Sequence, residues 1–295
     1  MGRSRRDSGD GHLHGVAVVD KDAGWTSHDV VAKARGILGT RKIGHSGTLD
    51  PDATGVLVLG VGRATKLLRF LQLLPKTYEC EIVFGTETNT LDAAGEVTAT
   101  YEMTLDPASV AAATVPLTGD IEQIPPMVSA VKIDGKRLHE LARKGIEVDR
   151  PARPVNVYRY DVTPTDDPLV YRALVDCSSG TYVRVLAADL GRALGGGAHL
   201  RNLRRTSVGA FTLADAHTLE DVTVIPMAEA VRGFPVVRVD EVTEAAIRVG
   251  AVLDSAALGV AGTGPWPVLS EAGELLAMYE PFGEGRVKPV VVLVG

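Results

Sequence analysis

The sequence is poor in cysteine and has no long apolar run, and these two absences exclude several classes of protein. The two cysteines of this 295-residue chain, Cys80 and Cys177, provide neither a disulfide framework nor the spacing of metal ligands. No uncharged apolar stretch reaches the roughly 18 residues that are needed to cross a bilayer. The opening MGRSRRDSGDGHLHG lacks the apolar region of a signal peptide. We therefore expect a cytoplasmic protein without membrane association, preceded by a disordered tail over residues 1–12.

A net positive charge is also missing, because 37 acidic residues against 31 basic ones give a formal net charge of −6. This balance argues mildly against a chain that binds nucleic acid over its whole surface. Basic residues nevertheless gather over residues 124–154 and again over residues 199–211, where Arg201, Arg204 and Arg205 stand. Such clusters are typical either of solvated faces or of contacts with RNA phosphates, so both interpretations stay open.

Length and composition indicate an ordinary globular chain with one large and one small domain. Hydrophobic residues make up 45% and charged residues 23% of the sequence. Short valine-rich segments from about residue 235 predict a small all-β domain over 235–295, after a larger domain over 13–232. In the larger domain the apolar periodicity predicts strands over 15–21, 56–62, 77–84, 155–162 and 169–177, and helices over 26–39, 63–74 and 186–194.

One glycine-rich segment, GHSGTLDPDATGVL over residues 44–57, presents a carboxylate in an unusual way. Pro51 restricts the backbone of Asp50 to an extended conformation, and the glycines allow a bend and a close approach by a ligand. An ordinary loop with Asx turns would have the same composition. An aspartate in this position could be a nucleophile, a general base or a metal ligand, and the spacing does not choose among these roles.

Three other residues could act together with Asp50. Arg184 falls in the first turn of a predicted helix, where the helix dipole disfavours a cation, so we expect an anionic partner nearby. A pair with Asp50 would orient that carboxylate and lower its pKa, although a surface ion pair is the simpler alternative. Tyr78 lies on the apolar face of its strand, either as a core residue or as a platform for a base. His45 is a loop histidine or a contact for nucleic acid.

The same segment also contains D-x-D-x-T, formed by Asp50, Asp52 and Thr54. This spacing resembles the nucleophile motif of haloacid-dehalogenase-type phosphatases, which use Mg²⁺ and in which an apolar strand delivers the first aspartate. Here the preceding RKIGHSGTL is interrupted by glycine, and the apolar strand follows the motif. A phosphatase would therefore require a strand immediately before Asp50.

Six segments between residues 15 and 211 resemble, in order, the motifs of the TruB family of tRNA pseudouridine-55 synthases. The family's catalytic pattern, G-H-x-G-x-L-D-P-x-A-x-G-x-L with A-T-K after it, matches GHSGTLDPDATGVLVLGVGRATK. The other five segments are GVAVVDKDAGWTSHDVV, KTYECEIVFGTETNTLDAAGEV, QIPPMVSAVKIDGKRLHELARKG, CSSGTYVRVLAADLG and HLRNLRRTSVGAF. A single motif would be weak evidence, but six in sequence are highly specific.

The resemblance implies a fold and a reaction. The fold is α/β (α+β), a pseudouridine-synthase fold whose mixed, largely antiparallel central sheet is flanked by helices, with a small C-terminal PUA-like β domain. The enzyme binds the T arm of tRNA, flips out a uridine and replaces its carbon–nitrogen glycosidic bond by a carbon–carbon bond. Neither a metal nor an organic cofactor is implied, and we expect a monomer.

The resemblance also assigns roles to individual residues. Asp50 matches the catalytic aspartate, Arg184 its arginine partner, and Tyr78 the tyrosine that stacks on the flipped base. Residues 124–154 match an RNA-clasping insertion that orders on binding. Together with the basic clusters, the resemblance implies a set of RNA-binding residues: Lys21, His45, Lys66, Lys132, Arg143, Leu200, Arg201 and Arg204. A non-catalytic RNA-binding protein would use the same basic residues without needing Asp50, so that alternative also stays open.

Overall fold

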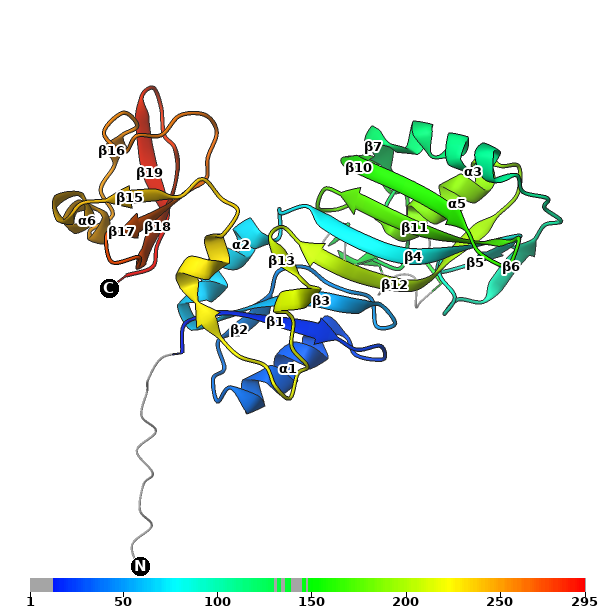
Figure 1. Ribbon diagram of the computed structural model, residues 1–295, viewed down its shortest axis with the longest axis horizontal. Coiled ribbons are helices and arrows are strands. Elements are labelled where there is room, and N and C mark those ends of the chain that lie inside the picture. The colour runs from blue at the N-terminus through cyan, green and yellow to red at the C-terminus, as the bar shows by residue number, and fades with distance from the viewer. Residues whose placement is uncertain (1–12, 130–131, 134–135, 139–144, 147, 295) are drawn as a thin grey trace, which may run out of the picture.

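The larger body of the protein is built on one ten-stranded sheet (Figure 1). The computed structural model describes residues 13–129, 132–133, 136–138, 145–146 and 148–294. The sheet runs in the order β14-β1-β3-β12-β4-β11-β10-β7, with β2 beside β3 and β13 beside β12. Its described strand pairs are antiparallel except for the parallel pair of β3 and β12, which confirms the mixed, largely antiparallel sheet. The strands are β1 Gly15–Lys21, β2 Ile43–His45, β3 Thr54–Val61, β4 Lys76–Phe84, β7 Gly119–Gln123, β10 Arg153–Pro164, β11 Val170–Cys177, β12 Ala198–Val208, β13 Phe211–Thr212 and β14 Ile225–Pro226.

Strands β1 and β3 are buried on both faces, which explains their continuous apolar sequences. Along β1, Ala17 and Val19 point into a core that also contains residues of helices α1 (Ser27–Ile37) and α5 (Val183–Ala193). Val16 and Val18 point into a second core on the opposite side of the sheet. The larger body therefore has a packed hydrophobic core on each face of its sheet.

Local sequence explains the main helices. Thr26 caps α1 through a reciprocal capping box with Asp29. Helix α5 buries Leu186 and Leu190 against the sheet, and it lies with α3 (Pro107–Ala113) over the β4, β10 and β11 part of the sheet (Figure 1). The helices predicted over 26–39 and 186–194 are therefore confirmed.

The helix predicted over 63–74 is wrong in type. The segment forms a 3-10 helix, η1 Gly62–Leu67, and only four α-helical residues, α2 Leu68–Leu71. The Thr65 hydroxyl donates to the Gly62 carbonyl at 2.8 Å, so a side chain competes for an acceptor that an α-helical turn would use. The basic segment 199–211 is largely strand β12.

The C-terminal unit packs directly on the larger body. Its five-stranded sheet runs β15-β17-β18-β19-β16, with bounds β15 Val237–Val239, β16 Leu253–Asp254, β17 Trp266–Ser270, β18 Leu275–Pro281 and β19 Arg286–Val292. It also contains helix α6 (Glu241–Arg248), so the all-β expectation is wrong in this detail. Met278 and Leu293 share the second core with Val16 and Val58 of the larger sheet.

Two short hairpins lie outside the two large sheets, and two of the expected segments lie wholly or partly outside the described residues. Two short hairpins are formed by β5 (Thr86–Thr88) with β6 (Val97–Thr100) and by β8 (Lys132–Ile133) with β9 (Lys136–Arg137). The expected tail over residues 1–12, and part of the expected insertion over 124–154, lie outside the described residues. Within the described ranges, no helix has the length and apolar character to cross a bilayer.

Candidate active site

The loop that carries Asp50 joins β2 to β3 and is held by side chains on both sides. The Lys21 ammonium donates to the Pro51 carbonyl at 2.9 Å, and Ser27 Oγ accepts from the Leu49 N–H at 2.9 Å. Arg205 donates from Nε to the Val56 carbonyl at 2.7 Å and from a terminal nitrogen to the Gly47 carbonyl at 3.2 Å. The sequence thus folds a glycine-rich bend into a fixed support for one carboxylate.

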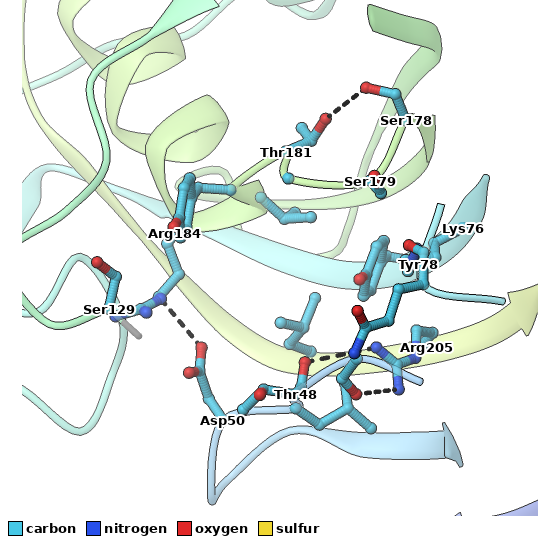
Figure 2. A pocket seen from close by; sticks show the side chains of 17 residues that line it. Thr48, Asp50, Lys76, Tyr78, Ser129, Ser178, Ser179, Thr181, Arg184 and Arg205 are labelled. Carbon is cyan, nitrogen blue, oxygen red and sulfur yellow. Dashed lines mark hydrogen bonds and ion pairs between the residues drawn. The ribbon is translucent and has the colours of Figure 1, made fainter. Parts of the chain in front are cut away.

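Arg184 is the partner of that carboxylate, as its place at the start of α5 predicted. Its Nε lies 3.1 Å from Asp50 Oδ2, and its side chain is almost completely buried (Figure 2). The remaining guanidinium nitrogens donate to the carbonyls of Thr90 and Val128, both at 2.8 Å. Asp92 approaches the same guanidinium at 3.4 Å. Contacts on three sides leave Arg184 a single orientation, and so fix Asp50.

The pKa of Asp50 is raised overall, although Arg184 lowers it as expected. The side chain is 41% exposed to the cavity, but protein surrounds it on the other sides, and this desolvation raises its pKa above the ordinary value. Arg184 opposes the effect, while Asp92 adds to it. Arg184 therefore offsets part of the cost of holding Asp50 ionised, and the carboxylate is more basic than one in water.

Tyr78 faces the same hollow as the ion pair. A cavity of about 270 Å³ is lined by Asp50, Arg184 and Tyr78, together with Lys76 and Arg205. Tyr78 comes from β4, whose alternating pattern places its side chain on the buried face, and burial raises the pKa of its hydroxyl. In Figure 2, Asp50 and Arg184 occupy one side of the cavity and Tyr78 the other. The three residues predicted to act together are brought together.

A second cavity, of about 390 Å³, lies against the same ion pair. It is lined by Leu200 and Arg201, by Asp52 and Asp92, and by Asp50 and Arg184, which border both cavities. Leu203 also borders both. The sequence analysis included Leu200 among the RNA-binding residues and missed Leu203, although both stand on β12.

Models of known families match most of the larger body. The first describes the "TruB family pseudouridylate synthase (N terminal domain)" and matches residues 35–183. The second describes the "tRNA pseudouridylate synthase B C-terminal domain" and matches residues 184–232. The chain belongs to the TruB family of pseudouridylate synthases. The phosphatase alternative is thereby excluded, in agreement with the loop residues that separate β2, ending at His45, from Asp50.

Relatives of this TruB-family chain cover nearly its whole length. It is 50% identical over 291 residues to tRNA pseudouridine synthase B of Nocardia farcinica, covering 95% of this chain and 94% of that protein. It is 47% identical to tRNA pseudouridine synthase B of Thermobifida fusca, covering 95% and 99%. Among solved structures, a chain in a Cbf5-Nop10-Gar1 complex is similar with a TM-score of 0.75 and 25% identity, covering 96% of this chain and 85% of that one.

Lys21 and Lys66, two of the expected RNA-binding residues, both donate to backbone carbonyls. Lys21 is 1% exposed and donates to the carbonyls of Asp22, Trp25 and Pro51, so in this TruB-family chain it supports the Asp50 loop. Burial lowers the Lys21 pKa to about 8, and nearby carboxylates oppose that shift. Lys66 donates to the Val292 carbonyl of the C-terminal unit and borders neither cavity around Asp50. The motif letters did not distinguish the buried Lys21 from the exposed Lys66.

The remaining expected RNA-binding residues occupy different settings. His45 accepts from the Gly47 N–H at 3.3 Å, packs edge-on against His28 and borders neither cavity. Arg201 pairs with Glu81 at 2.8 Å, and Arg204 pairs with Asp20 at 2.6 Å, each with part of its side chain exposed. Lys132 belongs to β8, but its side chain and the whole of Arg143 lie outside the described residues.

The two remaining cations of the first cavity were not selected as site residues from the sequence. Lys76 stands two positions before Tyr78 on the same face of β4, and that spacing was the signal that could have identified it. Arg205 was interpreted as part of a basic surface, but it is 1% exposed. Nothing in the run LRR distinguishes the buried arginine from its exposed neighbour Arg204.

Proposed function

We propose that this pseudouridine synthase isomerises uridine 55 in the T loop of tRNA to pseudouridine. The observation that carries the proposal is the Asp50–Arg184 pair, which faces Tyr78 across one cavity in a TruB-family chain. The similar proteins named tRNA pseudouridine synthase B support tRNA as the substrate. The T arm and position 55 are implied by the motif resemblance.

The reaction conserves all the atoms of the uridine. The bond between N1 and the ribose C1′ breaks, the uracil turns, C5 bonds to C1′, and the hydrogen on C5 leaves as a proton while N1 becomes protonated. Asp50 acts as a carboxylate, either on the ribose, through an acylal or a glycal, or on the uracil ring, through a Michael adduct. Arg184 orients the carboxylate, and Tyr78 stacks on the base and assists removal of the C5 proton. This internal rearrangement requires no external redox partner.

The target base must leave its loop to reach Asp50, so the surrounding surface has to hold the displaced RNA. Arg201 and Arg204 project from β12 with partly exposed guanidinium groups and are suited to phosphate contacts. We include His45, Lys132 and Arg143 in this surface as part of the proposal. The free thiols of Cys80 and Cys177 are compatible with a reducing cytoplasm, and we propose a monomer, which light scattering would check.

Tritium release from a T-arm stem–loop containing 5-tritiated uridine tests the assignment. We expect release and pseudouridine formation with the wild-type protein. Asp50→Asn keeps the side-chain size but removes the charge, and we expect it to bind the stem–loop with wild-type affinity and to release no tritium. If the wild-type protein bound the RNA but released none, the non-catalytic RNA-binding alternative would replace the enzyme assignment.

A further inference from the structure

The first cavity contains more positive charge than the catalytic pair accounts for. Asp50 and Arg184 neutralise each other, and the other two charged residues of the lining, Lys76 and Arg205, are both cations. Among the described residues, the ion pairs include neither of them. In the described part of the chain, the wall of the cavity opposite Asp50 therefore carries two positive charges without a carboxylate partner. Figure 2 shows Lys76 and Arg205 across the cavity from Asp50.

These two cations are buried, which makes their lack of an anion costly. Lys76 is 7% exposed and Arg205 is 1% exposed. The Lys76 ammonium donates to the carbonyls of Gln72 at 2.9 Å and Leu74 at 2.6 Å, which leaves one of its three N–H groups for another acceptor. Arg205 binds the carbonyls of Gly47, Thr48 and Val56. Carbonyl dipoles satisfy the donors, but they do not neutralise a buried charge as an anion would.

The electrostatics of Lys76 agree with this description. Burial, and then the neighbouring Arg205, lower its pKa to about 8. Both effects would be relieved by an anion in the cavity, which would hold the ammonium protonated. Beside Lys76 the cavity is lined by the loop of residues 178–181, which adds the hydroxyl groups of Ser179 and Thr181. Such a wall is suited to an oxyanion.

We propose that Lys76, supported by Arg205, binds a phosphodiester oxygen adjacent to the target uridine, so that this wall is a phosphate subsite for the flipped nucleotide. The proposal rests on the proposed function, because the ligand is the backbone of the same RNA. The uracil and ribose then lie between Asp50 and Tyr78, while the charged phosphodiester is held at the wall that carries Lys76 and Arg205. Lys76 thereby fixes how far the nucleotide enters, and its contact is sequence-independent.

A charge-neutral linkage tests the subsite. Stem–loops carrying one methylphosphonate, immediately 5′ or immediately 3′ of the target uridine, keep the shape of the phosphate but remove its charge. At one of the two linkages we expect the wild-type kcat/KM to fall by about 10- to 100-fold, the worth of one hydrogen bond between charged groups. Lys76→Met should show that loss on unmodified RNA and lose no more than about twofold further on the methylphosphonate.

The controls separate this result from misfolding and from a failed function. Lys33→Met removes an exposed lysine of α1 and should leave both substrates unaffected. Thermal unfolding checks each variant, and Lys76→Gln replaces Lys76→Met if the latter does not fold. The proposal is overturned if neither methylphosphonate weakens the wild-type enzyme, or if one weakens wild type and Lys76→Met equally. Absence of product from unmodified RNA would instead refute the proposed function, and the stem–loop Kd values would still decide the subsite.

Discussion

Ser27 links helix α1 to the catalytic loop, and its hydroxyl offers a test of how that loop is held. Ser27 Oγ accepts from the Leu49 N–H at 2.9 Å and donates to the Leu49 carbonyl at 3.2 Å. Leu49 immediately precedes Asp50, and both Ser27 and Leu49 are buried. Water therefore has no access to replace the hydroxyl if it is removed.

The expected cost follows from those two bonds. Ser27→Ala leaves a buried N–H and a buried carbonyl without a partner, at about 1–3 kcal/mol for each group. The better helix propensity of alanine returns at most about 0.5 kcal/mol. We therefore expect the free energy of unfolding to fall by about 1.5–6 kcal/mol, as measured by urea titration.

Catalysis should respond separately from RNA binding. A displacement of about 1 Å in a reacting group can cost up to about 100-fold in rate, so the single-turnover rate of Ser27→Ala should fall by about 10- to 100-fold. The stem–loop Kd should stay unchanged, because Ser27 borders neither cavity around Asp50. Ser109→Ala on α3, whose hydroxyl bonds the exposed Asp106, is the matched control and should change stability by no more than about 0.5 kcal/mol. A destabilised Ser27→Ala with a wild-type rate would refute the assignment of Ser27 to positioning Asp50.

Two other substitutions test the ion pair and the second core. Arg184→Met removes the cation that lowers the Asp50 pKa, so that pKa rises further. Because the carboxylate is the active form, the acid limb of the single-turnover pH–rate profile should move to higher pH by about 1–3 units. An unmoved acid limb would show that the limb belongs to another group. Leu293→Ala removes a buried side chain from the core shared by the C-terminal unit and the larger sheet, and should lower the free energy of unfolding by about 2–5 kcal/mol in urea. Exposed Leu73→Ala is its control, and equal effects of the two would contradict the shared core.

Much of the fold was predictable where one local pattern and the tertiary environment agree. The strict alternation of β4 placed Tyr78 and Cys80 on the buried face, and the capping signal at Thr26 began α1 at the right residue. The prediction over 63–74 failed because leucine spacing alone does not distinguish an α-helix from a 3-10 helix that runs into a short α-turn. The difference depends on Thr65 and on packing against the C-terminal unit.

The site was predictable in its anionic half and not in its cationic half. Helix-dipole reasoning about Arg184 led to Asp50 because an arginine at a helix start needs an anion. The pKa of Asp50 was misjudged because its burial is a property of the assembled cavity and not of the ion pair. Lys21 and Arg205 became supports of the loop through contacts with backbone carbonyls, which leave no trace in the sequence.

The shared core beneath β1 and β3 has a consequence for how the protein is made. Leu293 completes a core whose other members include Val16, from the first strand of the chain. Residue 293 is synthesised long after residue 16, so the part of this core that Leu293 covers stays exposed until that late segment has been made. A chain truncated before Leu293 would therefore keep the complete catalytic loop but expose apolar side chains of this core to solvent.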